Sequence, residues 1–164
     1  MHENRTPTTP LPASPRLTES ELVAWGERIG REAEPPLVIA LRGDLGAGKT
    51  TLARAIARGA GVVGNIPSPT YNLMFRYDAE RDRRVVHADL YRLEDESEVW
   101  AIGWSELPAD DELVLIEWPE RAEGRLPSPR WEITLGEGAD PESRAIQIVP
   151  VGDPAAIPTP EWAG

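Results

Sequence analysis

The sequence of 164 residues contains no cysteine, two histidines and a single lysine. The absence of cysteine excludes a disulfide framework, a cysteine-based zinc site and a thiol nucleophile. With His2 and His87 as the only imidazoles, a metal centre built from several histidines is also excluded.

Long apolar runs are missing as well. The longest, residues 37–41 and 113–116, fall far short of the roughly 20 residues that span a bilayer. The first residues, MHENRTPTTPLPASPR, have neither the apolar stretch of a secretory signal nor an Arg-rich amphipathic pattern. We therefore expect no membrane association and a cytoplasmic location.

Basic residues are outnumbered, 17 against 28 acidic ones, which gives a net charge of −11. Such a surface repels phosphate backbones, so strong binding of nucleic acid by this chain alone is not expected. The length suits one domain.

Proline is about twice as frequent as usual, and the excess lies at the two ends of the chain. Residues 1–16 and 150–164 are poor in large apolar side chains and are interpreted as disordered or extended, solvated tails. The folded domain is expected over residues 17–149.

Apolar periodicity predicts alternating helices and strands inside this domain. Thr18 and Glu21 form a capping box that starts the first helix. Helices are expected at 19–33, 49–60 and 95–106, and strands at 37–41, 71–77, 83–91, 113–117, 131–135 and 145–149. The pattern favours an α/β domain with a central, mainly parallel sheet and additional antiparallel strands.

A phosphate-binding motif, G-x-x-x-x-G-K-[ST], follows the apolar strand 37–41 and precedes a helix. Its glycines let backbone N–H groups turn inward at a helix N-terminus, where the helix dipole favours phosphate. Lys49 is expected to reach the β- and γ-phosphates, and the Thr50 hydroxyl to ligate Mg²⁺. The expected nucleotide contacts are Gly43, Asp44, Leu45, Gly46, Ala47, Gly48, Lys49, Thr50 and Thr51.

Lys49 is the only lysine among the 17 basic residues. Guanine-specific P-loop proteins read the base with an Asn-Lys-x-Asp segment, and this chain has no second lysine to supply one. ATP is therefore the expected nucleotide.

Two acidic residues end apolar strands. Glu117 follows Leu113–Ile116, the position that places a carboxylate beside Mg²⁺ in P-loop enzymes. Asp89 shares one strand face with His87 and Tyr91, so it could orient or deprotonate an attacking water with those two as supporting partners. A structural hydrogen-bonded cluster is the alternative.

Ser68 and Thr70 lie in a proline-containing loop placed like a switch I segment. Thr70 could sense the γ-phosphate or the metal. Alternatively, both residues cap a turn and the next strand.

Four ordered motifs resemble the TsaE family: GDLGAGKTT at 43–51, SPTY at 68–71, HADLYRL at 87–93 and IEWPER at 116–121. This resemblance implies a P-loop α/β fold and weak, Mg²⁺-dependent ATP hydrolysis. It also implies association with the TsaB–TsaD complex, which installs threonylcarbamoyl on adenosine 37 of tRNA; the chain would then meet tRNA only through its partners.

Carried over by position, the resemblance implies that Lys49 and Thr50 bind phosphate and Mg²⁺. It also implies that Glu117 is a second ligand on the metal side and that Asp89 is a catalytic or switch acid. Ser68 and Thr70 match the switch I loop. Trp118, Glu19 and Arg144 match positions near the nucleotide; for Trp118 a core or partner-facing role is equally open.

Two other functions remain open. A P-loop small-molecule kinase would need a mobile arginine-rich lid, for which residues 81–84 are a weak candidate. A nucleotide-dependent binding switch would show no turnover. Arg92, Arg121 and Arg144 are the candidates for an arginine finger, and slow, partner-stimulated hydrolysis is expected.

Overall fold

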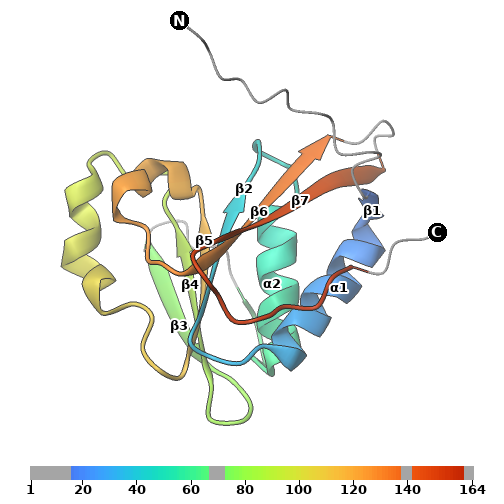
Figure 1. The fold of residues 1–164 in the computed structure, drawn as a ribbon, viewed down its shortest axis with the longest axis horizontal. Coiled ribbons are helices and arrows are strands. Elements are labelled where there is room, and N and C mark those ends of the chain that lie inside the picture. Colours follow the sequence, from blue (N-terminus) through green and yellow to red (C-terminus); the bar gives the residue numbers. More distant parts are fainter. Residues whose placement is uncertain (1–15, 67–72, 138–141, 161–164) are drawn as a thin grey trace, which may run out of the picture.

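A computed structural model describes residues 16–66, 73–137 and 142–160, in which seven strands form one sheet (Figure 1). The strand order is β1-β7-β6-β2-β5-β4-β3. The central strands β6, β2, β5 and β4 are parallel, while β1, β7 and β3 add antiparallel edges. This confirms the α/β fold with a mainly parallel centre. The strands are β1 (Arg16–Thr18), β2 (Leu37–Arg42), β3 (Met74–Asp78), β4 (Arg84–Asp89), β5 (Glu112–Glu117), β6 (Arg130–Glu137) and β7 (Ser143–Val151).

The two faces of the central strands are both buried, which explains their continuous apolar sequences. Alternate residues such as Ile39 and Leu115 pack towards the helices α1 (Glu19–Glu32) and α2 (Lys49–Ala60). Their neighbours, such as Val38 and Val114, pack under short helices on the other face. Figure 1 shows this three-layer arrangement, with α1 and α2 on one side of the sheet.

The second face carries three short 3₁₀ helices, η1 (Glu96–Ile102), η2 (Trp104–Glu106) and η3 (Pro119–Arg125). The single helix expected at 95–106 is wrong, because Gly103 adopts the left-handed conformation (φ 81°) and divides it. Asp95 starts η1 with a capping box: its side chain accepts hydrogen bonds from the first backbone amides of the helix, and the Glu98 carboxylate accepts one from the Asp95 amide (3.1 Å).

Helices α1 and α2 touch through their backbones. A Cβ added at Gly30 would lie 2.0 Å from the Ile56 carbonyl oxygen, and one at Gly59 would lie 2.0 Å from the Glu27 oxygen. Only glycine permits this approach. Arg83, which is buried, ties the ends of the two helices together by donating hydrogen bonds to Gly30 (2.6 Å) and Ala60 (3.1 Å).

In the described residues, both ends of the chain differ from the solvated tails that the sequence predicted. Arg16, assigned to the first tail, begins β1, which pairs with β7. Residues 152–160 form no helix or strand, but side chains of the domain hold them to its surface: the indole of Trp25 donates to the Pro158 carbonyl (2.8 Å) and that of Trp131 to the Ala155 carbonyl (2.7 Å). Their apolar anchor is Ile157, which contacts the core.

An ion-pair network joins β2, β6 and η3. Glu132 accepts hydrogen bonds from Arg42 (2.9 Å) and from Arg130 (2.8 Å), and Arg42 also pairs with Glu123 (2.8 Å). Burial would raise the pKa of Glu132, but the two guanidinium groups outweigh it and hold that pKa below its usual range. The network anchors the end of β2, where the phosphate-binding motif begins.

Within the described residues, no helix has both the length and the apolar character needed to cross a membrane.

The helix contact predicts a stability change for Gly59→Ala. The added methyl group has no space against the Glu27 carbonyl, so we expect the free energy of unfolding to fall by about 2 kcal/mol or more in urea denaturation. Gly136→Ala is the control, because its Cβ would have nothing nearer than the Ala145 methyl at 3.9 Å. Equal stability of the two variants would contradict close packing of the helices.

The Glu132 network predicts a pH-dependent stability. A carboxylate whose pKa is lower in the folded protein than in the unfolded chain stabilises the fold at pH values above its unfolded-state pKa. This stabilisation is lost as the pH falls through the folded-state pKa. We expect Glu132→Gln to cost about 1 kcal/mol at pH 7 and almost nothing well below pH 4. Urea unfolding at both pH values measures this, with exposed Glu137→Gln on the same strand as the control. A cost that persists in acid would show that the charge of Glu132 is not responsible.

Candidate functional site

The candidate site residues meet at the carboxyl edge of the parallel strands. β4 and β5 pair in register, with Asp89 opposite Glu117, and Leu41 of β2 lies opposite Glu117 on its other side. The loop 43–48 leaves β2 at this edge and leads into α2. Loop, helix start and both acids therefore face a common space, as ligand sites do in open parallel sheets.

The phosphate-binding loop has the backbone shape that its glycines allow. Gly43 and Gly48 have positive φ values of 145° and 107°, and Gly48 caps the N-terminus of α2. A Cβ at Gly43 would also lie 2.5 Å from the Leu135 carbonyl oxygen. The loop thus presents a helix N-terminus to the site, which is the geometry expected for binding an anion.

Lys49 is buried at the floor of this site. Its ammonium group donates to the carbonyl oxygens of Gly43 and Asp44, and it lies 3.5 Å from the centre of the Trp118 ring. Burial lowers the pKa of Lys49, while the nearby carboxylates, Glu117 first among them, oppose the shift. A desolvated ammonium that is held by carbonyls and an aromatic face is ready to exchange these partners for phosphate oxygens.

Trp118 reaches Lys49 because its backbone turns sharply. It adopts the left-handed conformation (φ 57°, ψ 50°) between the end of β5 and Pro119. Such a conformation costs a bulky residue about 1 to 2 kcal/mol, so neighbouring contacts must hold it. One is Tyr91, whose ring centre lies 4.8 Å from that of Trp118, and Arg121 lies over the Tyr91 ring at 5.6 Å.

Glu117 connects the sheet to the phosphate-binding helix. Its Oε1 accepts a hydrogen bond from the Thr50 hydroxyl (2.7 Å), so the two expected metal ligands are adjacent. In the part of the chain that the structure describes, no group of three or more His, Asp or Glu side chains could hold a metal. A cation here would therefore need oxygens from a bound phosphate or water, as Mg²⁺ commonly does.

Asp89 is half-buried at the end of β4. Its Oδ1 accepts a hydrogen bond from the Tyr91 amide (3.0 Å). Burial, followed by the charge of Glu117, raises the pKa of Asp89, against the opposing effects of the Tyr91 amide, His87 and Lys49. A carboxylate with a raised pKa at the edge of a cleft suits proton transfer.

His87 was expected to be a supporting partner of Asp89, but its hydrogen bond is made with Glu117. It shares the strand face of Asp89, but its Nε2 lies 2.6 Å from Glu117 Oε2. Tyr91 contributes its backbone amide to Asp89 and its ring to Trp118. The expected cluster is thus divided between the two acids.

In the part of the chain that the structure describes, two cavities flank the loop. The smaller, of about 290 Å³, lies on the side of the acids and is lined by Leu45, Gly46, Gly48, Lys49, Thr50, Thr51, Asp89, Tyr91, Glu117 and Trp118. We name it the phosphate pocket.

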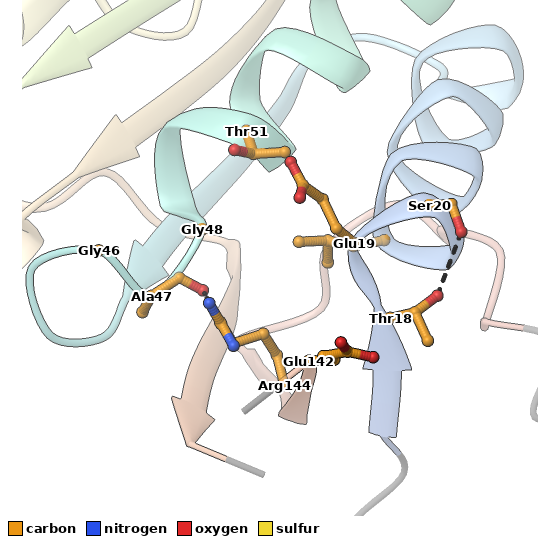
Figure 2. A pocket seen from close by; sticks show the side chains of 10 residues that line it. Thr18, Glu19, Ser20, Gly46, Ala47, Gly48, Thr51, Glu142 and Arg144 are labelled. Carbon is orange, nitrogen blue, oxygen red and sulfur yellow. Dashed lines mark hydrogen bonds between the residues drawn. The ribbon is translucent and has the colours of Figure 1, made fainter. Parts of the chain in front are cut away.

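The larger cavity, of about 580 Å³, lies between the loop, the start of α1 and β7 (Figure 2). Its lining includes the expected residues Glu19, Ala47 and Arg144, together with Ser20 and Glu142, which sequence reasoning missed. Arg144 reaches across from β7 and donates to the Ala47 carbonyl (3.1 Å). We name it the outer pocket; Gly46, Gly48 and Thr51 border both cavities.

Ser68 and Thr70 lie outside the described residues, so their assignment to a switch remains a prediction.

Comparison with known proteins identifies relatives of this chain. The model of the family described as "Threonylcarbamoyl adenosine biosynthesis protein TsaE" matches residues 17–146. A relative from Haemophilus influenzae, named tRNA threonylcarbamoyladenosine biosynthesis protein TsaE, is 44% identical over 116 residues, which are 71% of this chain and 72% of the relative. A protein of the same name from Bacillus subtilis is 37% identical over 74% of each chain. The crystal structure of Bacillus subtilis YdiB superposes with a TM-score of 0.69 and 28% identity over 84% of each chain.

The contact between Lys49 and the acids predicts a shift that can be measured on one residue. Glu117→Gln removes the carboxylate that most strongly opposes the lowering of the Lys49 pKa, so this pKa should fall further. Protein labelled with ¹³C-lysine gives a single lysine to titrate by NMR. Glu32→Gln, at the distant end of α1, is the control and should have no effect. An unchanged or higher pKa in Glu117→Gln would contradict the charge contact.

Proposed function

This chain belongs to the TsaE family, and we propose that it is an ATP-binding, Mg²⁺-dependent ATPase that acts with the TsaB–TsaD complex in tRNA threonylcarbamoyladenosine (t6A) modification. The observation that carries the proposal is the phosphate pocket, where Lys49 and Thr50 of the phosphate-binding loop meet Asp89 and Glu117 in one cleft. The cytoplasmic location expected from the sequence belongs to this proposal.

The two pockets support a nucleotide as the ligand. They adjoin at Gly46 and Gly48, so a nucleotide can place its phosphates beside Lys49 and its nucleoside part in the outer pocket, between Glu19 and Arg144. The sequence favours ATP over GTP, because the only lysine is already used at the phosphates.

The donor atoms of the phosphate pocket fit a magnesium ion. The Thr50 hydroxyl and the Glu117 carboxylate are hard oxygen ligands, and they lie 2.7 Å apart at the helix start. When bound, Mg²⁺ neutralises charge on the phosphate oxygens. Lys49 and the loop amides bind and orient the same phosphates.

Asp89 supplies the proton-accepting group. It borders the phosphate pocket, and burial has raised its pKa, which makes it a better base than an ordinary carboxylate. We assign it the role of orienting the attacking water and accepting its proton. The Tyr91 amide keeps one carboxylate oxygen in place while the other is available to the water.

Slow hydrolysis by the chain alone is part of the proposal. Among the described residues that line the phosphate pocket there is no arginine to stabilise the transition state. Arg144 lines the outer pocket, and the Arg121 guanidinium lies over the Tyr91 ring. A partner that completes the site would accelerate the reaction, and with a charge of −11 this chain would leave tRNA binding to that partner.

The kinase alternative is weakened by the arginines that it would need. Arg83 is buried and holds the ends of α1 and α2, and Arg81 donates to the Arg31 carbonyl (2.5 Å). The segment 81–84 forms the β3–β4 turn and the start of β4. It is therefore engaged in the fold and is not a mobile lid.

Phosphate release tests the proposal, measured with and without TsaB–TsaD. We expect weak turnover alone and stimulation by the complex. Asp89→Asn should lower the stimulated rate by about 100-fold while ATP binding persists, whereas Lys49→Ala should lose ATP binding. Asp110→Asn is the surface control.

Other outcomes separate the alternatives. Consumption of ATP only with a small acceptor would indicate a kinase, and binding without turnover in either condition would indicate a switch. Full ATP binding by Lys49→Ala would contradict the assignment of the phosphate pocket.

A further inference from the structure

His87 is a polar side chain in a place where apolar residues would be expected. It is 1% exposed on β4, and its neighbours on the strand, Val86 and Ala88, are completely buried. Its partner Glu117 is also 1% exposed. Replacing such a buried pair by apolar residues of similar volume is often neutral or stabilising, so stability by itself does not account for the pair.

The hydrogen bonds of Glu117 give its two oxygens different roles. A carboxylate only accepts hydrogen bonds, so His87 Nε2–H donates to Oε2 and the Thr50 hydroxyl donates to Oε1. Glu117 and Thr50 line the phosphate pocket, whereas His87 does not. Oε2 is therefore engaged inside the fold, and Oε1 is the oxygen beside the pocket.

We propose that His87 is the positioning residue of the metal site: it fixes the Glu117 carboxylate so that Oε1 is presented to the cation beside Thr50. This inference rests on the proposed function, because it concerns the Mg²⁺ of that site. The Thr50 hydroxyl can turn from Oε1 to the ion when nucleotide binds, but His87 keeps Oε2 engaged. This hydrogen bond holds the orientation of the carboxylate.

Strand pairing explains why His87 can do this. His87 lies opposite Leu115 in the parallel ladder, so its side chain is diagonal to Glu117, two residues further along the same face. Hydrogen bonds to metal-binding carboxylates commonly orient them, and their loss typically costs 10- to 100-fold in metal affinity. Because His87 does not line the phosphate pocket, its removal should leave contacts with the nucleotide itself unchanged.

The test separates metal binding from nucleotide binding. The affinity for ADP is measured by calorimetry in EDTA and again across a Mg²⁺ titration, for the parent protein, His87→Leu and His87→Gln. In His87→Leu we expect half-saturation to need about tenfold more Mg²⁺, with the affinity in EDTA within about twofold of the parent. His87→Gln keeps an N–H donor and should recover most of the Mg²⁺ response.

Val85→Ala is the matched control for loosening of the strand. Val85 is fully buried on the same face of β4, and it has no polar group to offer Glu117. It should lower stability and leave the Mg²⁺ requirement unchanged.

Three results would overturn the inference: an unchanged Mg²⁺ requirement in His87→Leu, an equal loss of affinity in EDTA, or the same Mg²⁺ shift in Val85→Ala. The proposed function fails in a different way, in the parent protein. If ADP bound to the parent with no dependence on Mg²⁺, the metal site itself would be wrong, and the role of His87 would fall with it.

Discussion

The parallel pairing of β2, β5 and β4 is the constraint on which the site depends. In parallel strands the carboxyl ends reach the same edge, so one register brings Asp89, Glu117 and the loop after Leu41 together. A shift of one residue in β4 would turn the face of His87 and Asp89 away from α2. Burial on both faces of these strands prevents that shift, because the alternating side chains fill two different cores.

Charge at this edge is arranged around Glu117. The Thr50 hydroxyl and His87 occupy its two oxygens, and its charge raises the pKa of both Lys49 and Asp89. At Lys49 this charge opposes burial, which lowers the pKa. At Asp89 it adds to burial, which raises the pKa. A single buried carboxylate thus acts on both the Lys49 ammonium and the Asp89 carboxylate.

Helix α1 connects the outer pocket with the rest of the domain. Its first residues line that pocket, and its glycine contact with α2 places it against the phosphate-binding helix. Residues 152–160 pack on α1 through Trp25. They lie beyond residues 17–146, which the family model matches. Stability and site geometry therefore share the same elements, and Arg83, far from the pockets, holds both helices at their other ends.

Local patterns were sufficient to predict the α/β fold, the phosphate-binding loop, and Glu117 and Asp89 at strand ends, because glycine spacing and apolar alternation act over a few residues. The interruption of the helix at 95–106 was missed, since Gly103 could as well have been a tolerated helix residue. The packing of residues 152–160 depends on the indoles of Trp25 and Trp131, distant in sequence. The sequence by itself determined which residues could carry the chemistry. Only the tertiary structure decided that His87 forms a hydrogen bond with Glu117 and that the Trp118 ring lies against Lys49. These contacts follow from the register of β4 on β5 and from one left-handed residue, and neither leaves a periodic signal in the sequence.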